Sequence, residues 1–81
     1  MFIVYILKSQ KDITKNYVGF TKDLGKRLLA HNAGRSLFSK RYAPWSAECF
    51  ITFTNEVKAR AFERYLKKGS GHAFLRKHLV T

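Results

Sequence analysis

Arg27 and His31 lie four positions apart in residues 21–34, a stretch that predicts a helix. At about 100° per residue, both side chains fall on the same face as Leu24 and Leu28, the leucines that must face the rest of the fold. An arginine in this place can hold a phosphate through two parallel hydrogen bonds, and a histidine can accept or donate a proton. The plainer interpretation is an arginine whose stem packs at the edge of the core, beside a half-buried histidine.

Two tyrosines lie on the strands expected before this helix. The apolar runs FIVYIL and YVGF predict the two strands of a β-hairpin with a wide loop. If the strands pair symmetrically about a loop centre near Lys11, Tyr5 lies opposite Tyr17, with the gap left by Gly19 beside them. Two adjacent phenols can position or deprotonate a water molecule. The commoner role of tyrosine in a strand is half-buried packing with the hydroxyl reaching water.

Glu63 is the acidic residue whose place needs an explanation, because it falls in the middle of a predicted helix, EVKARAFERYLKK, beside its apolar face. By contrast, Asp23 and Glu56 fall at predicted helix starts, where capping and the helix dipole explain them. A single carboxylate can bind a magnesium ion when waters and a substrate phosphate complete the coordination. The alternative is an exposed ion pair with Lys67, four residues further on.

The charge of the chain points to a polyanionic partner. Sixteen lysines and arginines stand against five acidic residues, giving a net charge of +11. A small domain this basic usually binds nucleic acid, and an anionic membrane surface is the next candidate. The residues expected to form the nucleic-acid surface follow the two main predicted helices and are Arg35, Lys40, Arg41, Lys67, Lys68, Arg76 and Lys77.

Length and cysteine content restrict the class of protein. The 81 residues are expected to form a single domain, 1–81. The lone Cys49 can form neither an internal disulfide framework nor a zinc site by itself. The opening MFIVYIL is too short for a signal peptide and far too short to cross a bilayer, so a cytoplasmic protein is expected.

The remaining elements complete an α+β domain in the order β-β-α-β-α-α. The first helix is capped by Thr21 or Asp23 and ended by Gly34, and RSLFSKRYAPWS is expected to be a loop. AECFITF predicts a third strand. Asn55 caps the second helix, GSG stops it, and HAFLRKHL predicts a last short helix.

The ordered set of IVYIL, YVGF, Arg27, His31 and Glu63 resembles the GIY-YIG nuclease domain, in its small single-domain bacterial form. The resemblance implies a central three-stranded antiparallel sheet flanked by helices. It also implies an endonuclease that hydrolyses phosphodiester bonds in DNA, including structured or damaged DNA as in DNA repair, with Mg²⁺ or Mn²⁺. Arg27 would bind phosphate and Glu63 would bind the metal.

By the same resemblance, Tyr5 and Tyr17 are the motif tyrosines and His31 is the helix histidine. A tyrosine is the first candidate for the group that takes the proton of water, and His31 is the second. Gly19 would be a structural glycine that lets substrate or a helix approach closely.

The chain departs from the family pattern at three places. Its first motif reads Ile3-Val4-Tyr5, without a glycine, its second reads Tyr17-Val18-Gly19, and no asparagine follows Asn55. The missing asparagine and the net charge of +11 favour a second hypothesis, a non-catalytic nucleic-acid-binding module on the same fold. A protein partner that supplies specificity is a further expectation, because so small a domain offers little surface for selecting a substrate.

Overall fold

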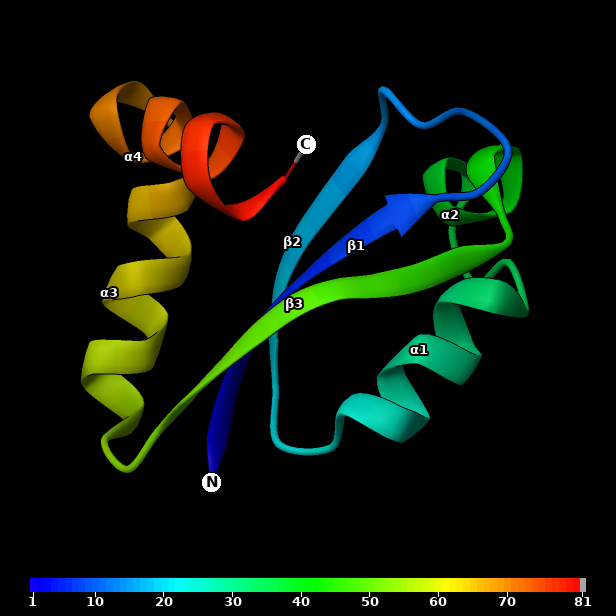
Figure 1. Ribbon diagram of the computed structural model, residues 1–81. Coiled ribbons are helices and arrows are strands. Elements are labelled where there is room, and N and C mark those ends of the chain that lie inside the picture. The colour runs from blue at the N-terminus through cyan, green and yellow to red at the C-terminus, as the bar shows by residue number, and fades with distance from the viewer. Residues whose placement is uncertain (81) are drawn as a thin grey trace.

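A three-stranded antiparallel sheet forms the centre of the protein in this computed structural model, which describes residues 1–80. Strand β1 lies in the middle, with β2 and β3 as its edges (Figure 1). The elements in chain order are β1 (Phe2–Ser9), β2 (Asn16–Thr21), α1 (Leu24–Asn32), α2 (Leu37–Tyr42), β3 (Trp45–Phe53), α3 (Glu56–Leu66), α4 (Gly69–Phe74) and the π-helical segment η1 (Leu75–Leu79). The expected α+β class and three-stranded sheet are confirmed.

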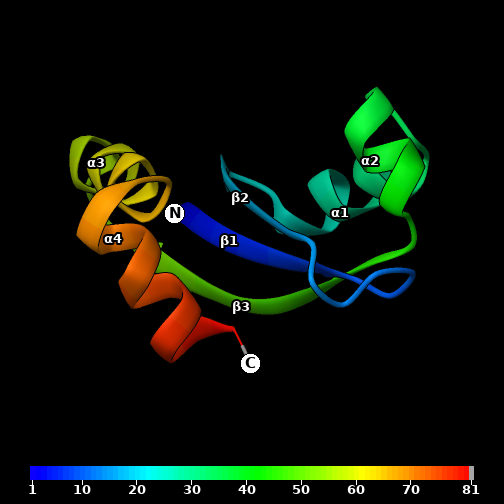
Figure 2. The same ribbon diagram turned by 90° about the horizontal axis from the view of Figure 1, so that it is seen from above.

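Strand β1 is buried on both sides, because helices cover both faces of the sheet. Figure 2 shows α3 and α4 on one side of the strands and α1 and α2 on the other. Since successive side chains of a strand point to opposite faces, Val4 and Ile6 pack toward one group of helices, and Tyr5 and Leu7 pack toward the other. This explains why the first strand is a continuous apolar run instead of an alternating one.

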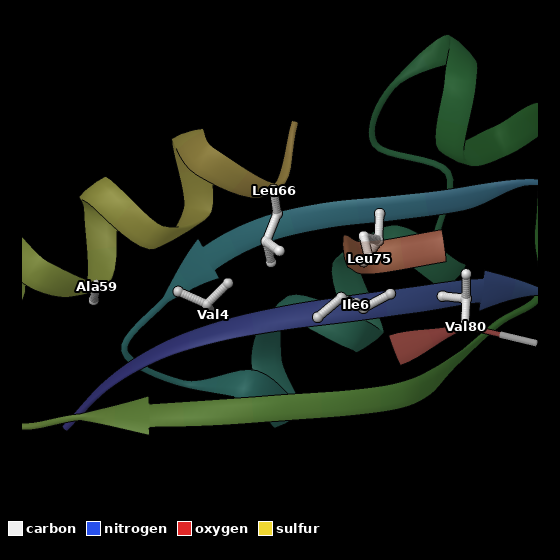
Figure 3. Packing of buried hydrophobic residues seen from close by; sticks show 6 residues of the cluster. All are labelled: Val4, Ile6, Ala59, Leu66, Leu75 and Val80. Carbon is white, nitrogen blue, oxygen red and sulfur yellow. The ribbon is translucent and has the colours of Figure 1, made fainter. Parts of the chain in front are cut away.

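The larger hydrophobic cluster joins β1 to the C-terminal helices. Figure 3 shows it in close-up, and its buried members are Val4, Ile6, Ala59, Leu66, Leu75 and Val80. The smaller cluster, on the other face, contains Tyr5, Leu7 and Trp45, with Leu24 and Leu28 of α1 packed against it. The two leucines of α1 therefore face the sheet as predicted.

Helix α1 begins and ends at residues that the sequence indicates. The side chain of Asp23 accepts a hydrogen bond from the backbone of Lys26, so Asp23 is the N-cap, and Thr21 instead bonds to the backbone of Asp23. Gly34 follows the helix with φ 71°, a left-handed conformation that glycine adopts without strain. Its N–H donates to the His31 carbonyl.

The prediction of a loop after α1 was wrong, since residues 37–42 form helix α2. Ser36 and Ser39 form a reciprocal capping box, in which each hydroxyl accepts a hydrogen bond from the backbone N–H of the other residue. A serine replaces the glutamate or glutamine usual at the second position. Helix α2 places Phe38 against Tyr42 and Trp45, with ring centroids 5.1 and 5.6 Å away.

The C-terminal helices differ in their limits from those expected. Asn55 caps α3 through the backbone of Lys58, as predicted. The prediction that GSG stops the helix was wrong: α3 ends at Leu66, the break is Lys67 and Lys68, and GSG forms the first turn of α4. Across residues 1–80, none of the helices combines the length and the apolarity that crossing a bilayer requires.

Candidate active site

The hairpin brings Tyr5 and Tyr17 together, but in a different register from the predicted one. Tyr5 pairs with Gly19, and Tyr17 pairs with Leu7. The prediction that Tyr5 lies opposite Tyr17 was wrong by two residues, and an offset of two keeps both side chains on the same face. The rings stack across the diagonal with centroids 6.2 Å apart and planes 24° apart.

The turn of the hairpin explains this register. The Ser9 hydroxyl accepts hydrogen bonds from the backbone of Lys11 and Asp12, and the Asp12 carboxylate accepts two from Thr14. The Ser9 N–H also donates to the Lys15 carbonyl. These bonds centre the turn on Asp12, one residue later than the sequence suggested, which moves the pairing by two residues.

Gly19 makes room for the side chain of Tyr5. A Cβ atom at Gly19 would lie 2.8 Å from Cε1 of Tyr5, and closer still to Cζ and the hydroxyl. The group that comes close to this glycine is therefore the phenol of the neighbouring strand rather than a helix. Its ring extends across β2, and its hydroxyl points to the edge of the sheet.

The phenol of Tyr5 meets His31, which α1 carries to the same point. The Tyr5 hydroxyl and Nε2 of His31 are 3.1 Å apart, and both residues are buried. The ring of Tyr17 lies over the same histidine, with centroids 4.5 Å apart. Two strands and a helix thus assemble a cluster of two phenols and one imidazole.

The ionisation of the pair follows from its burial. Burial raises the pKa of Tyr5 to about 12; Tyr17 adds to the rise, Arg27 opposes it and Glu63 adds to it. Burial, with a smaller effect of the Arg27 guanidinium, lowers the pKa of His31 below its usual value. At neutral pH the tyrosine is therefore protonated and the histidine is neutral, so the Tyr5 hydroxyl can donate to Nε2.

Glu63 lies on α3, which packs on the other side of the sheet, and it lines none of the cavities described within residues 1–80. Its carboxylate acts on the pKa of Tyr5, which links it to the phenol electrostatically. Its Oε2 also lies 2.5 Å from the Lys67 ammonium, so the expected i, i+4 pair is present. The Glu63 side chain is only 17% exposed, in contrast with the solvent-exposed pair of the simpler interpretation.

The donor set around Glu63 fits only one kind of metal ion. Within residues 1–80, no three His, Cys, Asp or Glu side chains come together in a way that would hold a metal. A single carboxylate excludes a closed zinc site, which needs three or four protein ligands. It suits a hard cation such as Mg²⁺, which keeps several waters and takes phosphate oxygens as ligands.

Three adjoining cavities form a groove along the β2 edge. A cavity of about 580 Å³ lies between α1 and α3, and one of about 180 Å³ lies above His31; both are lined by Arg27 and Ala30. A third, of about 350 Å³, lies between the hairpin and the C-terminal helices and shares Tyr17 with the second. We call these three neighbouring cavities together the β2 groove; Arg27 borders the first two, and Tyr17 borders the second and third.

The β2 groove is basic over its whole length. Three of the predicted nucleic-acid-binding residues line it, namely Arg35, Lys67 and Arg76. Five basic residues that sequence reasoning did not select line it too: Lys15, Lys22, Lys26, Arg60 and His72. Among the predicted residues outside it, Arg41 lines a separate hollow beside the hairpin loop. The other three, Lys40, Lys68 and Lys77, are exposed and line none of the cavities described within residues 1–80.

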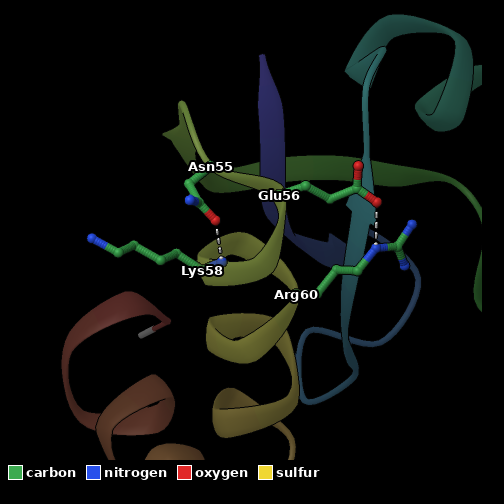
Figure 4. Close-up of polar contacts among 4 residues, drawn as sticks. All are labelled: Asn55, Glu56, Lys58 and Arg60. Atoms are coloured by element: carbon green, nitrogen blue, oxygen red, sulfur yellow. Dashed lines mark hydrogen bonds and ion pairs between the residues drawn. The ribbon is translucent and has the colours of Figure 1, made fainter.

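The sequence contains a signal that could have identified Arg60 as a residue of the groove. It lies three residues before Glu63, on the same side of α3. Its Nε donates to Glu56 at 2.9 Å, and its guanidinium lies 4.1 Å from the centre of the Phe20 ring. Figure 4 shows the side chain extending from α3 toward β2. It faces the groove across from Arg27.

Comparison with known proteins agrees with this architecture. Residues 1–77 match the GIY-YIG catalytic domain. The chain is also 36% identical over 69 residues to the UPF0213 protein CPE1444 of Clostridium perfringens (strain 13 / Type A), an alignment that covers 84% of this chain and 72% of that protein. With the fold and the predicted motif order in place, the chain belongs to the GIY-YIG family, whose domain is a nuclease-type fold.

Proposed function

We propose that this protein is a metal-dependent endonuclease that hydrolyses phosphodiester bonds in DNA bound in the β2 groove. The observation that carries the proposal is the hydrogen bond between the buried Tyr5 and a neutral His31, because His31 lines the middle cavity of the basic β2 groove. Arg27 lines the same cavity, and the Glu63 carboxylate raises the pKa of the same phenol. In the proposed reaction the Tyr5–His31 pair would be the acid–base group, Arg27 the cation and Glu63 the metal ligand that phosphodiester hydrolysis requires.

In the proposed mechanism, the proton of the attacking water passes through this pair. Tyr5 by itself is a weak base, because a pKa of about 12 leaves almost no phenolate at neutral pH. As the Tyr5 hydroxyl gives its proton to Nε2 of His31, its oxygen can take the proton of water. The water oxygen then forms the new bond to phosphorus while the bond to the leaving oxygen breaks, and solvent protonates that oxygen. Tyr5 is thus the immediate base and His31 the final acceptor.

Arg27 and Glu63 act on the phosphate in this scheme. The Arg27 guanidinium binds a non-bridging oxygen and balances the charge that develops on the phosphorane. Glu63 would hold Mg²⁺ or Mn²⁺ through one carboxylate, once Lys67 moves from Oε2 to a backbone phosphate. The bound ion would supply Lewis-acid polarisation of the phosphate.

A cleavage assay on supercoiled plasmid and on branched, flapped and fully paired oligonucleotides tests the proposal. Wild type should cleave with Mg²⁺ or Mn²⁺ and not with EDTA. Glu63→Gln, Arg27→Ala and Tyr5→Phe should each slow cleavage at least about 100-fold, since each removes a group that acts in the transition state. Glu48→Gln is the matched control, because it removes a carboxylate from β3, outside the β2 groove.

The same assay separates the alternative function. The pairing of Glu63 with Lys67 also suits a nucleic-acid-binding module without catalysis. Salt-dependent binding with no cleavage of any substrate, or cleavage that Glu63→Gln leaves unchanged, would overturn the nuclease proposal. In the first case the binding module would be the remaining interpretation.

A further inference from the structure

The cavity at the hairpin end of the β2 groove has features that phosphate binding does not explain. It is the 350 Å³ hollow lined by Tyr17 and Val18 of β2, by Phe38 of α2 and by residues at the end of α3 and in η1. Its volume is within the range of pockets that hold small organic ligands. It also has an aromatic wall, which a channel for a phosphate backbone alone does not need.

Phe38 is an exposed aromatic ring that its neighbours hold in place. It is 41% exposed, although the ring packs on Trp45 behind it and on Tyr42 beside it. The capping box of Ser36 and Ser39 fixes the short helix that carries it. A partly exposed phenylalanine held this way in the wall of a cavity offers a stacking surface without a further cost of ordering the side chain.

The rest of the wall provides what a nucleotide needs besides stacking. Thr14 and Asn16 bring polar groups from the end of the hairpin, and Lys15, Lys67 and Arg76 bring positive charge. Tyr17 borders both this cavity and the one above His31, so an occupant would lie directly beside the Tyr5–His31 pair. Its ring is 6.2 Å from that of Phe38.

We propose that this cavity binds one unpaired nucleobase next to the scissile phosphate, with Phe38 as its stacking platform. A paired base has both faces covered by its neighbours in the duplex and cannot enter. The substrate would therefore carry at least one unpaired nucleotide at the cut, as in a single strand, a flap or a bulge. This inference rests on the proposed function for the position of the cut, but the base-binding site itself can be tested without cleavage.

The experiment measures binding of fluorescent single-stranded oligonucleotides in EDTA, so that no cleavage occurs. Each oligonucleotide of the series carries one abasic site at a different position in its single strand. A short duplex at one end makes every oligonucleotide bind in the same register. In wild type, one position should weaken binding by about 5- to 140-fold, the range expected for one base stacked on an aromatic ring. In Phe38→Ala the base-containing strand should bind correspondingly more weakly, and that position should lose its sensitivity.

Controls separate stacking from folding. Phe38→Trp should retain the sensitive position, and Phe38→Leu should lose it while keeping the packing against Trp45. Phe50→Ala is the matched control, since Phe50 is 56% exposed on β3 and lies outside the cavity. Melting temperatures show whether each variant is folded at the assay temperature.

Two results would overturn the inference: no sensitive position in wild type, or a sensitive position that Phe38→Leu leaves unchanged. Failure of the nuclease proposal would be distinguishable, because the abasic-site sensitivity would remain while no substrate was cleaved in Mg²⁺. Failure of the base pocket alone would leave cleavage intact and equally fast on paired and unpaired substrates.

Discussion

Substitution of Gly19 by alanine tests the central contact of the site, where the Tyr5 ring crosses β2. The added Cβ would lie 2.8 Å from Cε1 of Tyr5, so the ring would have to move by about 0.6 Å or more to reach the 3.4 Å of ordinary contact. The Tyr5 side chain is buried and hydrogen-bonded to His31, so it cannot move without disturbing its packing and that hydrogen bond.

The expected loss of stability combines three effects. Overpacking a buried site costs about 1–3 kcal/mol, and losing the bond between Tyr5 and His31 costs about 1 kcal/mol. Replacing a strand glycine by alanine returns about 0.5–1 kcal/mol of chain entropy. Gly19→Ala should therefore lower the free energy of unfolding by about 1–3.5 kcal/mol.

Urea unfolding followed by the fluorescence of Trp45 measures this loss. Trp45 is the single tryptophan and is 3% exposed in the folded protein. In a Tyr5→Leu background the atoms that clash are absent, so the same Gly19→Ala change should cost less than about 0.5 kcal/mol. Gly25→Ala is the control: its Cβ would meet only Asp23 Oδ1 at 3.6 Å, and α1 should gain up to about 1 kcal/mol.

Equal costs of Gly19→Ala in the wild-type and Tyr5→Leu backgrounds would refute this reasoning. So would a wild-type cost below about 0.5 kcal/mol, within the range of surface substitutions. Either result would mean that the position of the Tyr5 ring does not require a residue without a side chain at position 19.

Three further predictions concern pH, capping and charge. The pKa of His31 is lower in the folded protein than in the unfolded chain, so below about pH 6.5 the unfolded chain takes up a proton on His31 before the folded protein does. The free energy of unfolding, measured by urea titration at each pH, should therefore fall from pH 7 to 5, and it should fall less in His31→Gln. Identical pH slopes in the two proteins would contradict the depressed pKa. Asn55→Ala removes the cap of α3 and should cost about 1 kcal/mol in the same assay, while Lys58→Ala, which leaves the capped N–H in place, should change stability by less than about 0.5 kcal/mol. Arg60→Ala should reduce the slope of log K against log salt for duplex DNA by about 1 if Arg60 contacts a phosphate, and an unchanged slope in an anisotropy titration would exclude that contact.

The sequence by itself determined those features that depend on local periodicity and end signals. The apolar run of the first strand, the leucines of α1 and the caps at Asp23 and Asn55 all act over a few residues, so their spacing carries the information. The residue types of the candidate site were visible for the same reason. Their order along the chain was enough to identify the family.

Tertiary structure decided the register of the hairpin and the existence of α2. The register depends on the hydrogen bonds of Ser9 and Asp12 inside the turn, which outweigh the symmetry of the apolar pattern. Helix α2 has six residues, too few for a helical period to be evident, and it is stabilised by two serines and by Phe38 packing on Trp45. The serine pair is local but lacks the glutamate or glutamine that usually marks a capping box, and the contact of Phe38 with Trp45 forms only in the fold.

The β2 groove is likewise a product of the fold alone. Arg27 and Arg60 are far apart in sequence and meet only because α1 and α3 cover opposite faces of the sheet and both reach past the edge of β2. The protonated state of Tyr5 and the neutral state of His31 have the same origin, since burial between two strands and a helix sets both pKa values. The sequence shows which reactive side chains are present, and the position of β2 at the sheet edge, between two layers of helices, brings those side chains together.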